Sequence, residues 1–201
     1  MICADLHFHT CYSPDASTQP KAIVERLNQN PTIKALAITD HNTTEGYEKV
    51  RKLAKPYEDI IIIPGIEISA EEGEIILLGI TELPLKPWKV QNLTDYAHAN
   101  NALAVAPHPY RGLGLKDQIR DLNIDAIEIL NAITSPKLNR KAEQLARTQG
   151  LPGVAGSDVH AQGDPWNVYT EINAESDLDE ILRAVKKGSV RVFQTDRSIR
   201  F

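Results

Sequence analysis

A chain of 201 residues is long enough to bury one substantial hydrophobic core, and we expect a single domain over residues 1–201. Hydrophobic residues make up 42% of the chain and charged residues 24%, the composition of an ordinary globular protein. The formal net charge of −5 gives no general attraction to nucleic-acid backbones, so nucleic acid is a less expected partner than a small molecule.

Short apolar runs alternate with amphipathic stretches along the chain. The runs of strand length are 2–6, 35–39, 60–63, 75–78, 103–106, 126–130, 154–155 and 190–193. Helix-like patterns cover 20–28, 44–54, 93–103, 136–149 and 177–187. Gly150 and Gly188 follow the last two patterns, at positions where helices commonly stop.

This alternation predicts an α/β fold with parallel strands. About seven βα units in a chain of this length favour a compact, distorted barrel, although an open doubly wound sheet would show the same alternation. The segment 67–80 interrupts the pattern with two short strands around Glu71, Glu72 and Gly73. We expect a hairpin-like insertion there.

Five of the six histidines directly follow apolar strands, at His7, His9, His41, His108 and His160. Carboxylates occupy the same places, at Asp5, Asp40, Glu67 and Asp158. Because the carboxyl ends of parallel strands share one face of the fold, these side chains are expected to converge. His98 lies within a helix-like stretch and is left out of the predicted site.

Two of these segments have ligand spacing. His7 and His9, like Asp158 and His160, are two residues apart, which places both side chains on one side of an extended strand. A lone pair of this kind is as often structural as functional, but the accumulation of acids and histidines favours a metal site. Imidazole with carboxylate suits Zn, Mn or Fe, and such mixed sets leave positions open for water.

Five segments, in order, resemble the motifs of the PHP superfamily, named for polymerase and histidinol phosphatase domains. They are Asp-Leu-His-Phe-His-Thr at 5–10, Thr-Asp-His-Asn at 39–42, Pro-Gly-Ile-Glu-Ile-Ser at 64–69, Ala-Pro-His-Pro at 106–109 and Gly-Ser-Asp-Val-His at 156–160. The resemblance implies a distorted (β/α)7 barrel, similar to a TIM barrel, with two or three divalent metal ions at the C-terminal ends of its strands.

The resemblance also implies which residues hold the metals. The three expected sets are His7, His9, Glu67 and Asp158; Glu67, as a bridge, with His108; and Asp15, His41 and His160. Many family members place a further histidine for the second metal on the strand after the acidic motif, and Ile76 stands at that position here. Glu74 points to the same face, and is expected to be either an oxygen ligand or a solvated hairpin residue.

The expected activity is hydrolysis of a phosphate monoester of a small molecule, such as a nucleotide, a sugar phosphate or a compound like histidinol phosphate. The expected nucleophile is a hydroxide that bridges two metals near Glu67 and Asp158. Arg111 is the candidate phosphate ligand, and His160 or His41 the candidate proton donor to the leaving oxygen. Asp40 and Asp5 are the candidates for orienting ligand histidines.

Two alternatives remain open at this stage. One is a phosphodiesterase or exonuclease acting on nucleic acid, and the other is a metal-binding scaffold domain with weakened catalysis. A cytoplasmic location without a membrane partner is expected, since residues 1–7 lack the pattern of a secretory signal and no run approaches the roughly 18 apolar residues of a membrane helix. Cys3 and Cys11 are not expected to form a disulfide there.

Overall fold

The computed structural model describes the backbone of residues 1–199 and the side chains up to residue 195. Strands and helices alternate along most of this length. In chain order they are β1 Ile2–Asp5, α1 Pro20–Gln29, β2 Ala35–Ile38, α2 Glu45–Ala54, β3 Ile61–Ser69, β4 Glu74–Leu78, α3 Val90–Ala99, β5 Leu103–Ala106, the 3-10 helix η1 Lys116–Asp121, β6 Ala126–Asn131, α4 Pro136–Gln149, β7 Gly153–Gly156, β8 Trp166–Ile172, α5 Leu178–Lys186 and β9 Val190–Ile199.

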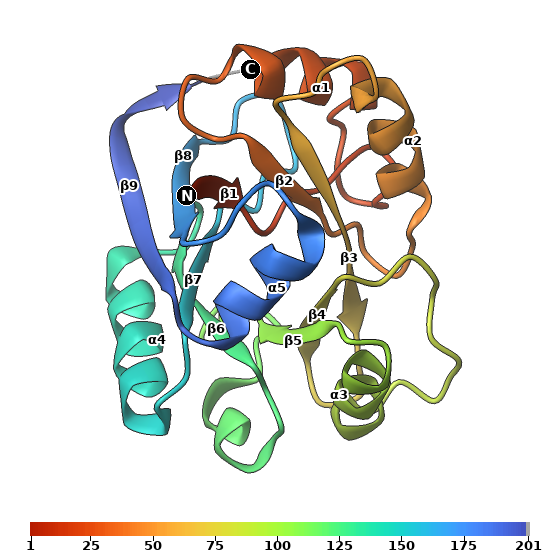
Figure 1. The fold of residues 1–201 in the computed structure, drawn as a ribbon. Coiled ribbons are helices and arrows are strands. Elements are labelled where there is room, and N and C mark those ends of the chain that lie inside the picture. The colour runs from red at the N-terminus through yellow and green to blue at the C-terminus, as the bar shows by residue number, and fades with distance from the viewer. Residues whose placement is uncertain (200–201) are drawn as a thin grey trace.

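The strands form one curled sheet. Their order is β7-β6-β5-β4-β3-β2-β1-β8-β9. The two sides of the sheet come together where the Leu6 N–H donates to the carbonyl of Ala155 at 3.3 Å and the Ala155 N–H donates to the hydroxyl of Thr170 at 2.8 Å (Figure 1). The sheet is therefore a nearly closed barrel, which confirms the predicted α/β barrel and excludes the open doubly wound alternative.

The strand directions are more mixed than the sequence predicts. β1–β2, β2–β3, β5–β6 and β6–β7 pair in parallel, whereas β4 is antiparallel to both β3 and β5. The expected hairpin at 67–80 therefore forms part of the barrel wall and is not an insertion outside it. β8, antiparallel to β1 and β9, was not predicted, because its sequence alternates buried and half-exposed side chains and contains no apolar run.

Helix ends follow from local chemistry. α4 begins at Pro136, whose missing N–H is no loss at a first helical position, and it stops at Gly150, where φ is +66°. α5 follows Asp177, whose carboxylate accepts the Glu180 N–H at 3.0 Å and so caps the helix. Among the described residues no helix is long and apolar enough to cross a membrane.

One end of the barrel is covered by α5 (Figure 1). Ile181 and Leu182 of this helix pack in one buried cluster with the first residues of several strands, including Ile2, Ala35 and Leu103. Since those residues lie at the N-terminal ends of their strands, α5 closes that end. The C-terminal ends of the strands remain available for polar side chains.

Candidate metal centre

The polar side chains at the C-terminal ends of the strands form one cluster. His7 and His9 follow β1, and Glu67 lies in β3. Isolated β-bridges join Phe8 to Val159 and His41 to Glu67. These bridges hold together the chain segments on which the histidines and carboxylates lie. The cluster contains His7, His9, His41, Glu67, His108, Asp158 and His160, with Asp15 at its edge.

The first predicted set is tightly packed. His7 Nε2 lies 3.0 Å from His9 Nε2, and these two atoms lie 3.1 and 3.2 Å from Glu67 Oε2. Both also lie 3.3 Å from Asp158 Oδ1. In a tetrahedral site with ligands at about 2.0–2.2 Å, neighbouring ligand atoms stand roughly 3.3–3.6 Å apart. The four side chains, each at most 1% exposed, fit a single divalent ion.

The charge of this set favours a cation at its centre. Burial lowers the pKa of the His9 imidazole, but hydrogen bonds to Asp158 and Glu67 outweigh burial and raise that pKa to about 9. Burial likewise opposes protonation of His7, whose pKa is raised well above its usual value by the charges of Asp158 and Glu67. Two buried carboxylates therefore attract positive charge here, from a proton or from a metal ion.

The second predicted set uses the other oxygen of Glu67. Glu67 Oε1 lies 3.2 Å from His108 Nε2, while Oε2 faces His7 and His9. One carboxylate thus faces two groups of imidazoles, the arrangement of a bridging ligand. Ile76 is directly opposite Glu67 in the β3–β4 ladder and is buried at 1% exposure.

The third predicted set lies closer to solvent. Asp15 Oδ2 is 3.5 Å from His41 Nε2 and 3.4 Å from His160 Nε2, and Asp15 is half exposed. Ser13 holds this set in place, because its hydroxyl donates to Asp15 Oδ1 at 3.0 Å and accepts the His41 N–H at 3.1 Å. The ring centroids of His9 and His160 are 4.2 Å apart, so the third set adjoins the first.

A family model for the PHP domain matches residues 5–190. The chain belongs to the PHP domain family. This membership confirms the resemblance carried by the five sequence motifs. Together with the cluster of histidines and carboxylates, it supports the predicted class of metal-dependent hydrolase.

Several known proteins are similar to this PHP domain. The uncharacterized protein MJ1587 of Methanocaldococcus jannaschii is 37% identical over 141 residues, which cover 64% of this chain and 81% of the relative. PsfC from Pseudomonas syringae superposes with a TM-score of 0.69 at 18% identity, over 98% of this chain and 93% of PsfC. A protein of Bifidobacterium adolescentis, provisionally described as a metal-dependent phosphoesterase, gives a TM-score of 0.63 at 15% identity, over 78% of this chain and 87% of its own. Both structural likenesses concern the fold.

Glu128 is a member of the PHP domain site that sequence reasoning missed. Its Oε1 lies 3.0 Å from His7 Nδ1, and its Oε2 accepts the backbone N–H of His108 at 2.7 Å. Asn131 donates to Glu128 at 3.0 Å and to Asp158 at 3.1 Å. The sequence did contain a signal, because Glu128 is an ionisable residue inside the apolar run 126–130. A glutamate in a strand that is expected to be buried is not explained as a surface residue.

Asp40 and Asp5 bind backbone N–H groups in the PHP domain, and that they orient ligand histidines stays a prediction. Asp40 accepts the N–H of Thr10 at 2.6 Å and the hydroxyl of Thr10 at 2.8 Å. Asp5 accepts the backbone N–H groups of His7 at 3.2 Å and Ser157 at 2.9 Å, and also contacts the Ser157 hydroxyl. Burial raises the pKa of Asp5 to about 7 and that of Asp40 to about 6.

Arg111 lies at the edge of the PHP domain cluster. Its guanidinium contacts Asp158 Oδ2, and its backbone N–H donates to the His108 carbonyl at 2.9 Å. The side chain is 32% exposed whereas Asp158 is 1% exposed, so the guanidinium stands between the buried carboxylate and solvent. Trp166 is buried at 1% exposure, with its ring 5.2 Å from that of Phe8.

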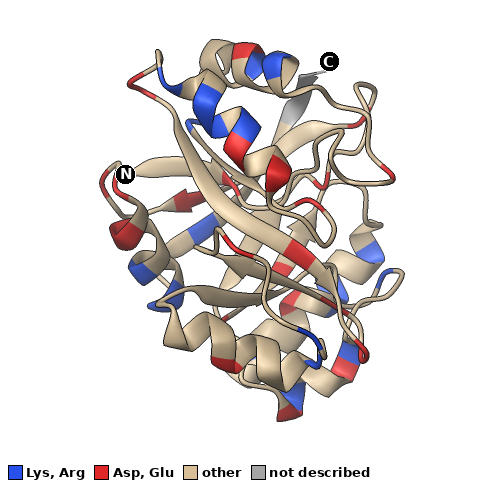
Figure 2. Cartoon of the chain, turned by 90° about the vertical axis from the view of Figure 1, so that its right-hand side faces the viewer, with Lys and Arg blue, Asp and Glu red and all other residues tan. Residues whose placement is uncertain are grey.

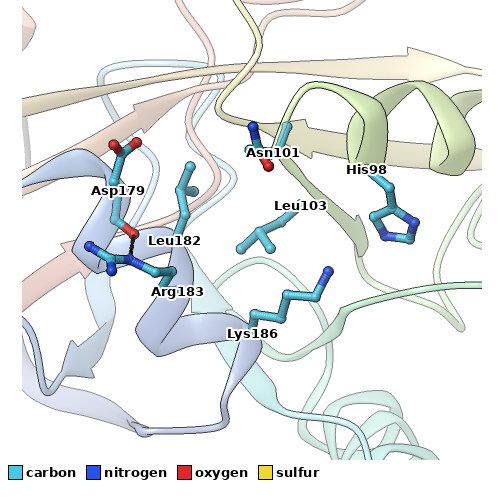
Figure 3. A pocket seen from close by; sticks show the side chains of 8 residues that line it. His98, Asn101, Leu103, Asp179, Leu182, Arg183 and Lys186 are labelled. Atoms are coloured by element: carbon cyan, nitrogen blue, oxygen red, sulfur yellow. Dashed lines mark hydrogen bonds between the residues drawn. The ribbon is translucent and has the colours of Figure 1, made fainter.

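His98 lies away from the cluster, as expected. Its Nε2 is 2.8 Å from Asp125 Oδ2. It lines a cavity of about 460 Å³ between α3 and α5, together with Leu103, Leu182 and Lys186 (Figure 3). This cavity lies beside the helix that covers the N-terminal ends of the strands.

Proposed function

We propose that this PHP domain hydrolyses a phosphate monoester of a small molecule, with divalent ions held by the predicted sets of histidines and carboxylates. The observation that carries the proposal is the mutual approach of His7 Nε2, His9 Nε2, Glu67 Oε2 and Asp158 Oδ1, with measured separations from 3.0 to 3.3 Å. Bound ions would supply Lewis acidity, which neutralises phosphoryl oxygens and makes a nearby water more acidic.

Arg111 is the proposed phosphate-binding residue. A phosphate that approaches the cluster from solvent meets this guanidinium beside Asp158. A guanidinium presents several N–H donors in a planar fork, which matches two phosphate oxygens and offsets the acidic surroundings.

His160 is the proposed proton donor or third-set ligand. Its Nδ1 lies 2.9 Å from the backbone carbonyl of Asp158, so Nδ1 carries the proton in the neutral ring and Nε2 is left free to accept. That Nε2 faces Asp15 at 3.4 Å. An ion in the third set would be held by Nε2, and without one the ring could carry a proton on Nε2 and donate it to the leaving oxygen.

A small substrate is favoured by the distribution of charge. In the view of Figure 2, Lys and Arg are interleaved with Asp and Glu on the helices. The formal net charge is −5. Binding of a long nucleic acid depends mainly on Lys and Arg contacts to successive phosphates, which this arrangement does not favour.

Parallel assays test the proposal. Purified protein loaded separately with Mn²⁺, Zn²⁺ or Fe²⁺ is given a nucleotide monophosphate, a sugar phosphate and single-stranded DNA. We expect release of phosphate from at least one monoester, and loss of that activity by at least about 100-fold in Asp158→Ala with the circular dichroism spectrum retained. Preferential cleavage of DNA, or no hydrolysis with any of the three metals, would contradict the proposal.

A further inference from the structure

We propose that Glu74 supplies a carboxylate ligand to the second ion, beside Glu67 and His108, and lowers the preference of that position for Zn²⁺ over Mn²⁺. The inference rests on the proposed metal centre. It decides between the two roles that the sequence leaves open for Glu74, and it adds a metal preference.

The ladder between β3 and β4 places Glu74 on the inner face of the barrel. Glu67 is opposite Ile76 in this antiparallel pair, and directly opposed residues share a face of the sheet. Glu74, two residues before Ile76, is on the same face. Because β4 begins at Glu74, this carboxylate lies one step nearer the cluster than the buried Ile76.

Distances show that Glu74 reaches the second set. Glu74 Oε2 lies 3.9 Å from His108 Nε2, and Glu67 Oε1 lies 3.2 Å from the same nitrogen. Ligand atoms of Glu67, Glu74 and His41 all lie within 4.8 Å of one another. Atoms bound to one ion at about 2.0–2.2 Å stand at most roughly 4.4 Å apart. Both distances to His108 therefore fit a common ion.

The surroundings of Glu74 lack another explanation for a largely shielded charge at this position. Its side chain is 13% exposed. Within the described part of the chain, no Lys or Arg nitrogen lies within 4.0 Å of it, and its one ion-pair contact is His108. Two carboxylates on one inner face repel each other unless a cation lies between them, and burial strengthens that repulsion. A divalent ion beside His108 would offset both charges.

The ligand types set the metal preference. The first set has two imidazoles and two carboxylates, whereas the set around Glu74 has two carboxylates and one imidazole. Carboxylate-rich sites suit Mn²⁺ better than imidazole-rich sites do, and imidazole suits Zn²⁺. We therefore expect the second position to favour Zn²⁺ over Mn²⁺ less strongly than the first position does.

Metal counting with matched variants tests the inference without an activity assay. Glu74→Gln keeps the size of the side chain and removes its charge. Glu71→Gln makes the same change at an exposed residue of the same hairpin, 3.8 Å from Lys89. Chelator-stripped protein is reloaded with Mn²⁺ and desalted, and its metal content and electron paramagnetic resonance spectrum are recorded.

We expect wild-type protein and Glu71→Gln to show the spectrum of a spin-coupled Mn²⁺ pair. We expect Glu74→Gln to lose about one equivalent and to show mainly isolated ions. A variant Glu74→His, read by the ratio of Zn²⁺ to Mn²⁺ taken up from an equimolar mixture, should shift that ratio toward Zn²⁺ by at least about tenfold. It also provides the test if Glu74→Gln does not fold.

The outcomes separate the two proposals. Unchanged Mn²⁺ content in Glu74→Gln, or an unchanged metal ratio in Glu74→His, would overturn the inference alone. Wild-type protein that binds a single, isolated ion would also overturn it and leave the first metal set intact. Wild-type protein that takes up no divalent ion would remove the proposed function as well.

Discussion

His7 is held by carboxylates on both of its ring nitrogens. Glu128 lies 3.0 Å from Nδ1, and Glu67 lies 3.1 Å from Nε2. A carboxylate that accepts from Nδ1 fixes the tautomer and leaves the Nε2 lone pair directed at the metal position. The same Glu128 accepts the backbone N–H of His108, whose φ is +25°, so it also holds that residue in an unusual backbone conformation.

Replacing Glu128 is expected to weaken metal binding without removing a ligand. Glu128→Gln removes the negative charge from His7 Nδ1, and loss of such a partner typically costs about 10–100-fold in metal affinity. Competition with a chelating dye measures the effect, with Glu25→Gln on the exposed face of α1 as the control. Equal affinities in the two variants would argue against this role for Glu128.

The raised pKa of His9 gives the metal-free protein a characteristic pH dependence. The pKa is about 9 in the fold and about 6.5 in an unfolded chain, so the protonated ring stabilises the fold fully below pH 6.5 and less as pH rises through 9. The raised pKa of His108 acts in the same direction. Chelator-treated protein should therefore melt at progressively lower temperature from pH 6.5 to 9.

Metal-loaded protein is the control for this measurement. Its ligand nitrogens are already deprotonated, so it should not show the same decline. A melting temperature of the chelated protein that stays level or rises over this interval would contradict the assigned surroundings of His9.

At the scale of elements, sequence patterns locate most helices and strands to within a few residues. α4 has the predicted bounds, 136–149, because Pro136 and Gly150 mark its ends chemically. α3 begins at Val90, before the predicted 93, since no strong capping residue precedes it. β8 was missed because it contains no continuous apolar run, since its buried residues alternate with half-exposed ones.

The start of α2 packs closely against the side chains of Asp40 and Thr10, and this close approach depends on a glycine. A Cβ at Gly46, near the start of α2, would overlap the Asp40 carboxylate and the Thr10 hydroxyl. Gly46→Ala should therefore destabilise the fold by about 1–3 kcal/mol through overpacking. Gly163→Ala, where a Cβ meets nothing within 4 Å, should stay within about 0.5 kcal/mol of wild type. Denaturant unfolding measures both, and equal stabilities would contradict this contact.

At the scale of the whole molecule, the two ends of the barrel carry different kinds of side chain. Ile181 and Leu182 of α5 cover the N-terminal ends of the strands with apolar side chains. The buried His7, His9, His108 and Asp158 lie at the opposite ends, in loops that follow β1, β5 and β7, and the buried Glu67 lies near the C-terminal end of β3. Convergence of these residues was predictable because the ends of parallel strands meet wherever a barrel forms.

What the sequence did not predict depends on register and on the direction of individual side chains. Glu128 faces inward because of its position in β6, next to a register shift between Glu128 and Leu130 in the ladder with β7. The contacts of Asp40 with Thr10 arise from the course of a loop. Neither feature follows from hydrophobic periodicity, which gives the type of an element and not the partner of each polar group.

The central claim is that His7, His9, Glu67 and Asp158 bind one divalent ion. A crystal structure of the Mn²⁺-loaded protein, with anomalous data collected on both sides of the manganese absorption edge, tests it most directly. We predict an anomalous peak within about 2.0–2.4 Å of His7 Nε2, His9 Nε2 and one oxygen each of Glu67 and Asp158. A map with no peak among these four side chains, or with peaks only elsewhere, would contradict the account.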